Sequence, residues 1–291
     1  FLNTPKTSKN IIENEINIPM SGIYNEYSVY TTDIHENSSD NSINEVGVHN
    51  LHYGANLVSF SVIPDDNSLN NVIDCSGIIN SIIGEGEASS CTSNGWVGNL
   101  NQIQPDKGYW IKVGAQHLRT IVGQDQTSQV LSLHYGANLL SYTCDGNLAV
   151  QDVLGEECSG DIISIIGEGE ATACTANGWV GNLSHLKPGR GYWFKSSTSF
   201  QQIYFDCPEL EHAYYGRVSE DNHEPVDYIQ STEQAFYIFK DIEGVEVGER
   251  INVYFNEFLI GSTIWNGQYT TVPVMGDDFQ EDTNGYIVEN Q

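Results

Sequence analysis

Six cysteines are the residues of this 291-residue chain whose chemistry is easiest to define. A structural metal site is one interpretation, but the sequence has no C-x-x-C pair and no His at ligand spacing, so we do not expect zinc. Catalytic thiol chemistry needs an unpaired, activated cysteine, which we do not expect either. Disulfide bonds remain as the predicted role of Cys75, Cys91, Cys144, Cys158, Cys174 and Cys207.

A second chemically capable group is the acidic stretch G-D-D-F-Q-E-D-T-N-G at residues 276–285. Carboxylate and amide oxygens are the ligands of hard cations such as Ca²⁺. The spacing does not match the D-x-[DN]-x-[DN]-G pattern of an EF-hand loop. The candidate calcium ligands are Asp277, Asp278, Asp282 and Asn284, and the sequence implies no other cofactor.

Glutamates and histidines also recur at matched positions. The glutamates lie on Gly-rich turns, where acid–base or calcium chemistry is conceivable, but a glycosidase pair must flank its substrate and nothing fixes that geometry. We therefore expect solvated turns. The dipeptides His52-Tyr53 and His134-Tyr135 precede a Gly and a strand without a neighbouring nucleophile motif, which favours a packing or hydrogen-bonding role. We find no reaction in the sequence and predict that the protein is not an enzyme. The glutamates are Glu85, Glu87, Glu168 and Glu170.

Aromatic residues next to Gly turns are the best candidates for ligand contact, because sugar-binding surfaces stack rings against exposed Trp and Tyr. The simpler interpretation, which we favour, is that these large rings fill the cores of small modules. Neighbours on a strand point to opposite faces, so at least one ring of each Tyr-Trp pair is a candidate for the outer surface. The residues concerned are Trp96, Tyr109, Trp110, Trp179, Tyr192 and Trp193.

An internal repeat organises the middle of the chain. HYGANLVSF at 52–60 returns as HYGANLLSY at 134–142, 82 residues later. IIGEGEA and NGWVGNL also occur twice, each 83 residues apart, and GYWIK at 108–112 returns as GYWFK at 191–195. Such self-similarity indicates two copies of one module. We therefore divide the chain into an extended N-terminal arm (1–49), repeat one (50–128), repeat two (129–208) and a C-terminal module (209–291).

The repeat also predicts the disulfide pairing. Cys75 and Cys158 are equivalent, and so are Cys91 and Cys174, so equivalent bonds join Cys75 to Cys91 and Cys158 to Cys174. Cys144 and Cys207 remain for a third bond, which would require the first and last strands of repeat two to be neighbours. A fully paired set indicates an oxidising compartment, such as the cell exterior, cell surface or virion surface.

The fold class is mainly β with small α content. Alternating patterns at 57–62, 78–83, 109–113 and 118–122 predict strands, and 68–73 predicts a short helix. Short strand patterns at 235–239, 251–255, 258–260, 270–274 and 286–288 predict a C-terminal β-sandwich. In the arm, residues 16–30 read as a strand and 35–44 as a loop.

Composition excludes several function classes. The 39 Asp and Glu against 11 Lys and Arg give a net charge of −28, which argues against nucleic acid or anionic membrane as a partner. No apolar run is long enough to span a bilayer, so we expect no membrane insertion. The opening Phe1-Leu2-Asn3-Thr4 has no Met, and we expect a processed chain or a piece of a longer one.

The repeat motifs also carry a family resemblance. G-A-N-L-[VL]-S, I-I-G-E-G-E-A, W-V-G-N-L and P-x-x-G-Y-W-[IF]-K resemble tandem repeats of secreted, cell-surface and virus-associated proteins of marine microbes, over residues 51–206. Such repeats commonly carry G-W-N-L where this chain has G-A-N-L. The cysteine pairs are a further departure from that pattern.

Residues 229–288 are similar to a second module of the same kind of protein, through STEQAFY, VGERI, GSTIW and VPVMGDD. In that kind of module the position of Arg250 is usually acidic and further strands follow the Gly-Tyr. The resemblance implies an extracellular structural or adhesive role and supplies no catalytic residues. A strand missing from this module would leave an open edge, which residues 16–30 of a neighbouring subunit are suited to fill.

Together these observations predict a non-enzymatic, extracellular structural subunit of a surface assembly, such as a filament, sheath, fibre or virion appendage. Self-assembly as a homo-oligomer or filament is the expected partnership. The alternative is a carbohydrate-binding adhesin or receptor-binding module that contacts surface glycans through its aromatic residues.

Overall fold

The computed structural model describes residues 45–75, 77–126, 130–144, 146–155, 158, 160–199, 201–205, 207, 217–218, 228–279 and 282–288. These residues form mainly β structure in several antiparallel sheets, with two short helices, so the predicted fold class is confirmed. The strand predicted at 16–30 and the loop at 35–44 lie outside the described residues. Within the described part of the chain, none of the helices has the length and hydropathy needed to cross a membrane.

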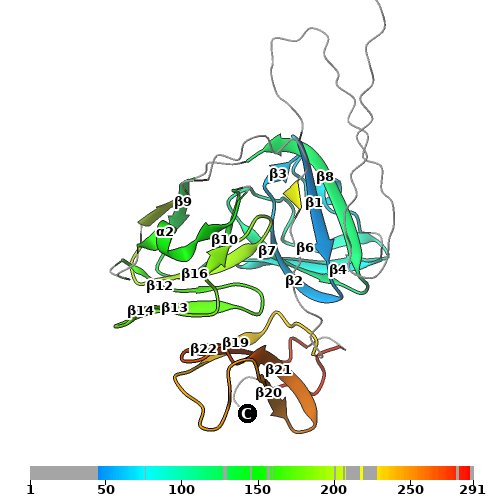
Figure 1. The fold of residues 1–291 in the computed structure, drawn as a ribbon. Coiled ribbons are helices and arrows are strands. Elements are labelled where there is room, and N and C mark those ends of the chain that lie inside the picture. Colours follow the sequence, from blue (N-terminus) through cyan, green and yellow to red (C-terminus); the bar gives the residue numbers. More distant parts are fainter. Residues whose placement is uncertain are drawn as a thin grey trace, which may run out of the picture. The chain divides into compact units, whose positions relative to one another are not determined.

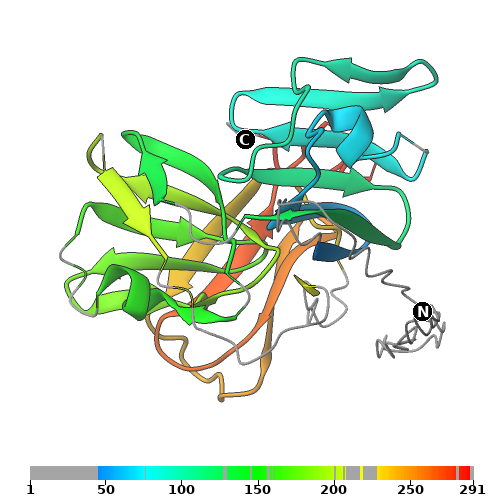
Figure 2. The same cartoon turned by 90° about the horizontal axis from the view of Figure 1, so that it is seen from above.

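Repeat one is built on a five-stranded antiparallel sheet, drawn in blue to cyan tones in Figures 1 and 2. Its order is β2 (Gly54–Ser59), β7 (Gly108–Val113), β4 (Ile79–Gly84), β5 (Glu87–Thr92) and β6 (Gly95–Gly98). A second sheet has the order β18 (Arg217–Val218), β1 (Glu45–Leu51), β8 (His117–Asp125) and β3 (Val62–Ile63). Helix α1 (Leu69–Val72) turns Leu69 and Val72 into the core between them.

Repeat two reproduces this plan, in green in the same figures. Its five-stranded sheet has the order β10 (Gly136–Ser141), β16 (Gly191–Ser196), β12 (Ile162–Ile166), β13 (Ala171–Thr175) and β14 (Gly178–Gly181). Two smaller sheets pair β9 (Val130–Leu133) with β17 (Gln201–Tyr204) and β11 (Leu148–Ala149) with β15 (His185–Leu186). Helix α2 (Val150–Leu154) occupies the place of α1.

All three predicted disulfides are present, with Cα–Cα distances of 5.2–5.5 Å. The bond between Cys144 and Cys207 joins residues just beyond the ends of β10 and β17. Strand β17 pairs with β9 rather than with β10, so the neighbouring strands at the two ends of this repeat are β9 and β17. The disulfide therefore links the segment that follows β10 to the segment that follows β17.

The C-terminal module contains two strand pairs. Strand β19 (Gln234–Phe239) pairs with β22 (Thr270–Met275), and β20 (Arg250–Phe255) pairs with β21 (Phe258–Ile264). They enclose a small core of Tyr228, Ile260, Val274, Met275 and Tyr286. The strand predicted at 286–288 is reduced to a single bridge between Gly276 and Ile287.

Candidate functional site

The two repeats meet along a seam where two glycines approach each other. A Cβ added to Gly108 would lie 2.8 Å from the Leu140 carbonyl oxygen and 3.3 Å from the Gly191 Cα. A Cβ on Gly191 would lie 2.7 Å from the Val58 carbonyl oxygen and 3.2 Å from the Gly108 Cα. Each repeat thus offers the same glycine to the same strand of the other, an isologous contact within one chain.

The recurring histidines cross this seam. His52 of repeat one bonds through Nε2 to the Glu168 carboxylate of repeat two, and His134 of repeat two bonds to Glu85 of repeat one. The other carboxylate oxygens accept backbone N–H bonds, from Leu57 to Glu168 at 2.6 Å and from Leu139 to Glu85 at 2.9 Å. The expected hydrogen-bonding role of the histidines is confirmed. A solvated turn was the wrong expectation for Glu168, because the partner repeat covers that turn and leaves the Glu168 side chain only 2 % exposed.

The G-A-N-L motif positions these histidines. The Asn56 side chain accepts a hydrogen bond from the His52 backbone N–H and donates to the His52 carbonyl. Asn138 makes the same pair of bonds to His134. Each asparagine closes the turn before the strand and thereby fixes the direction of the imidazole ring.

Both nitrogens of each ring face oxygen acceptors. Nδ1 lies 2.7 Å from the Tyr53 carbonyl in His52 and 2.8 Å from the Tyr135 carbonyl in His134, while Nε2 faces a carboxylate. Only the protonated imidazolium donates from both nitrogens. The carbonyl of Tyr135 and the Glu85 carboxylate accordingly raise the pKa of His134 above its ordinary value. The seam therefore favours the charged form of His134.

The predicted ligand-contact aromatics lie mainly in interiors. Tyr109 and Tyr192 are fully buried, and their hydroxyls accept backbone N–H bonds from Gln104 and Lys187. Trp110 does point away from its own core, but the other repeat covers it in a seam cluster with Ala55, Leu57, Leu139 and Trp193. Trp96 and Trp179 are partly buried against the two cores, and each indole N–H donates to a backbone carbonyl.

Two of the four candidate calcium ligands, Asp278 and Asp282, pair with a lysine instead. Lys112 of strand β7 is 4 % exposed, and its Nζ lies 3.1 Å from Asp278 and 2.8 Å from Asp282. Burial alone would raise the pKa of Asp278, but the Thr283 hydroxyl and the Lys112 ammonium group more than offset this and hold the pKa below its ordinary value. Asp277 accepts the Phe279 backbone N–H, and Asn284 is exposed. The calcium site stays a prediction. In this structure the Lys112 ammonium group is the cation that pairs with Asp278 and Asp282.

The same position in repeat two is uncovered. Lys195, the counterpart of Lys112, is exposed, and so is Ala137, whereas its counterpart Ala55 is fully buried and donates to the Gln230 carbonyl. Tyr135 is 71 % exposed against 47 % for Tyr53. The C-terminal module thus distinguishes two otherwise matched repeats.

The C-terminal module itself leaves two strands half uncovered. Along β19 and β20 several side chains are exposed, in contrast to β22, where all six residues are buried. Among the described residues, β19 pairs only with β22 and β20 only with β21. The exposed apolar residues of these strand pairs are Tyr237, Ile238, Tyr254 and Phe258. Edge strands with such side chains are templates for pairing with another chain.

Sequence reasoning missed Lys112, His49 and Arg119. The lysine belongs to the repeated G-Y-W-[IF]-K motif, which gave no sign that one copy would be buried. His49 and Arg119 stand in repeat one where repeat two has apolar residues, a difference that strand register makes visible. Comparison of the chain with protein-family models, with curated proteins and with solved structures found no match.

Proposed function

We propose that this protein is a non-enzymatic, extracellular structural subunit whose copies assemble through the C-terminal module. The observation that carries the proposal is that, among the described residues, β19 and β20 each have a partner strand on one side alone, while Tyr237, Ile238 and Tyr254 on these strands and Phe258 on β21 are exposed. Apolar side chains on an unpaired edge favour addition of a strand from another chain. In a surface assembly that strand would come from residues 16–30 of the next copy.

The rest of the described chain supports a mechanical role. One disulfide lies within repeat one and two lie within repeat two, and such bonds persist in oxidising surroundings outside the cell. The crossed histidine–glutamate pairs and the paired glycines hold the repeats as one unit. A net charge of −28 keeps unassembled subunits in solution through mutual repulsion.

The test measures the assembly state of the full chain by sedimentation velocity and negative-stain imaging. Wild-type protein should form larger species as its concentration rises, and Ile238→Lys should shift the distribution toward the monomer. A synthetic peptide of residues 16–30 should compete and have the same effect.

The matched control is Ile163→Lys. Ile163 is 38 % exposed and Ile238 is 39 % exposed, but Ile163 lies on β12, which has a partner strand on both sides. This substitution should leave assembly unchanged. A wild-type chain that stays monomeric at every concentration would refute the proposal.

A further inference from the structure

One position in repeat one departs from the plan that the two repeats share. In the ladder between β1 and β8, His49 is opposite Arg119. In the corresponding ladder of repeat two, between β9 and β17, Leu131 is opposite Ile203. His49 and Leu131 are 82 residues apart, the same offset that relates His52 to His134, so the two pairs are equivalent.

The equivalent site in repeat two is an ordinary apolar core. Leu131 is 1 % exposed and Ile203 is 5 % exposed, and both belong to the same cluster as Tyr142 and Phe205. Tyr142 is the counterpart of Phe60, which is also fully buried. The module therefore folds with two aliphatic side chains at this pair of positions.

The polar pair His49 and Arg119 of repeat one lowers the stability of the fold by comparison with the apolar pair of repeat two. His49 is 5 % exposed, and burial lowers its pKa to about 4, so the ring is neutral. Its Nε2 bonds to the Ser59 carbonyl at 2.9 Å, while Nδ1 has no hydrogen-bond partner among the described residues. Buried polar atoms without partners lower stability, so this pair has a reason other than folding.

Arg119 shows the same pattern. Its guanidinium lies 5.9 Å from the centre of the Phe60 ring, and its buried Nη1 makes no hydrogen bond to any residue that the structure describes. Burial lowers the pKa of Arg119 to about 10, with the Asp74 carboxylate acting in the opposite direction. At neutral pH the group is a cation with donor capacity to spare.

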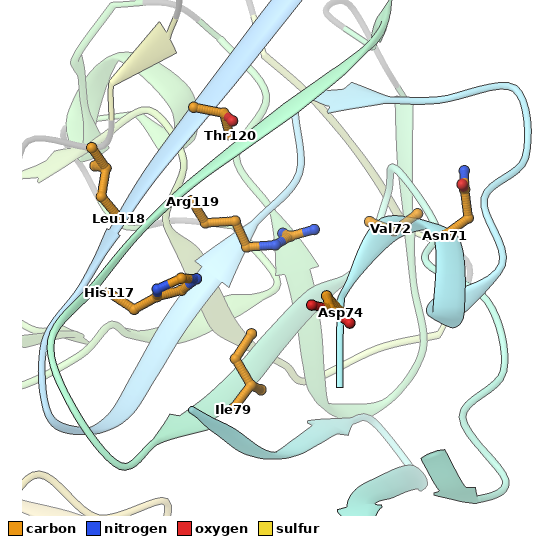
Figure 3. Close-up of a pocket in the computed structure, with 8 residues that line it drawn as sticks. All are labelled: Asn71, Val72, Asp74, Ile79, His117, Leu118, Arg119 and Thr120. Carbon is orange, nitrogen blue, oxygen red and sulfur yellow. The ribbon is translucent and has the colours of Figure 1, made fainter. Parts of the chain in front are cut away.

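A cavity of about 300 Å³ lies at this guanidinium. Figure 3 shows Arg119 and His117 extending from strand β8 toward helix α1 and Asp74, with Ile79 below them. Asn71 and Thr120 also line the space. The lining thus combines one strong cation, one carboxylate, an imidazole, amide and hydroxyl groups, and aliphatic side chains.

We propose that this cavity binds a sugar residue that carries a single carboxylate, a uronic acid. The carboxylate would bind the Arg119 guanidinium, whose planar donors match carboxylate geometry. The negative charge of Asp74 repels a compact dianion such as sulfate, while its carboxylate oxygens would accept hydrogen bonds from sugar hydroxyls. A pyranose fits the volume of the cavity, which the core residue Ile79, only 1 % exposed, closes on one side.

The second repeat supplies the variant that tests the proposal. His49→Leu with Arg119→Ile copies the Leu131 and Ile203 pair into repeat one. Because an apolar pair replaces buried polar groups, thermal stability should be unchanged or higher. Loss of the charge-assisted bonds should weaken glucuronate binding about tenfold or more.

Binding is measured by calorimetry or ligand-observed NMR on the full chain with glucuronate, glucose and inorganic sulfate. Glucuronate should bind, glucose should bind about tenfold more weakly or not at all, and sulfate should not bind. A short galacturonate oligomer distinguishes a polymer-borne sugar from the free acid, since tighter binding of the oligomer identifies the polymer as the source. Glucuronate that fails to bind wild type, or that binds the double variant equally well, overturns the proposal, as does a double variant that is strongly destabilised.

This site and the assembly proposal are separable. The cavity lies in repeat one, while the open edges belong to the C-terminal module. Ile238→Lys should therefore leave glucuronate binding unchanged.

Discussion

His134 of repeat two lies against Glu85 of repeat one, with the histidine side chain 57 % exposed and the glutamate side chain 23 % exposed. Their counterparts His52 and Glu168 make the same contact in the opposite direction, with side-chain exposures of 29 % and 2 %. One geometry thus occurs in a wet and a dry setting within one chain. This difference makes several properties of the seam measurable.

The exposed pair should make stability depend on pH. The folded-state pKa of His134 is raised above its unfolded value, so its stabilising effect is complete below about pH 6.5 and is lost as the pH rises through the folded-state pKa. His134→Gln should therefore lower the melting temperature more at about pH 6 than at about pH 9. A melting-temperature difference that is the same at both pH values would contradict this expectation.

The two glutamates should differ in their energetic effect. Glu168→Gln leaves Arg190, 3.4 Å away, and His52 without their buried anion, and should reduce the free energy of unfolding by about 3–5 kcal/mol. Glu85→Gln alters a partly exposed pair and should cost about 1 kcal/mol or less. Denaturant titration of both variants measures the difference. Equal losses would show that the drier setting of Glu168 does not matter.

The two motif lysines provide a second matched comparison. Lys112→Met leaves Asp278 and Asp282 without their buried cation and should cost about 3–5 kcal/mol. Lys195→Met, at the exposed counterpart, should stay within about 0.5 kcal/mol of wild type. Hydrogen exchange should accelerate in residues 228–288 of the Lys112 variant alone. Unchanged exchange there would mean that this ion pair does not hold the C-terminal module.

The glycine contact sets how closely the repeats approach. Gly108→Ala places a methyl group 2.8 Å from the Leu140 carbonyl oxygen and should destabilise the chain by about 1–3 kcal/mol. Gly114→Ala is the control, because its Cβ would meet nothing closer than 3.7 Å. Thermal melts of the two variants test the prediction. A Gly108 variant as stable as the control would show that the two repeats can move apart to accommodate the methyl group.

The sequence by itself determined the local and the duplicated features. Residue pattern predicted β2, β4, β7 and β8 of repeat one and the four strands β19 to β22, but not β1, β5 or β6. Equivalence between the repeats predicted the bonds Cys75–Cys91, Cys158–Cys174 and Cys144–Cys207. These features could be read because strand patterns repeat every two residues and because equivalent cysteines form equivalent bonds. Residue pattern also indicated that Tyr109 and Trp110 point to opposite faces of their strand, without deciding which of them faces outward.

Only the tertiary structure decided what covers each outward face. Trp110 is buried by the other repeat, and Glu168 lies inside a turn that the sequence presents as solvated. Lys112 and Lys195 stand in nearly identical motifs, yet one is buried against two carboxylates and the other is exposed. Burial depends on contacts between segments far apart in the chain, and a local pattern carries no information about which distant segment arrives.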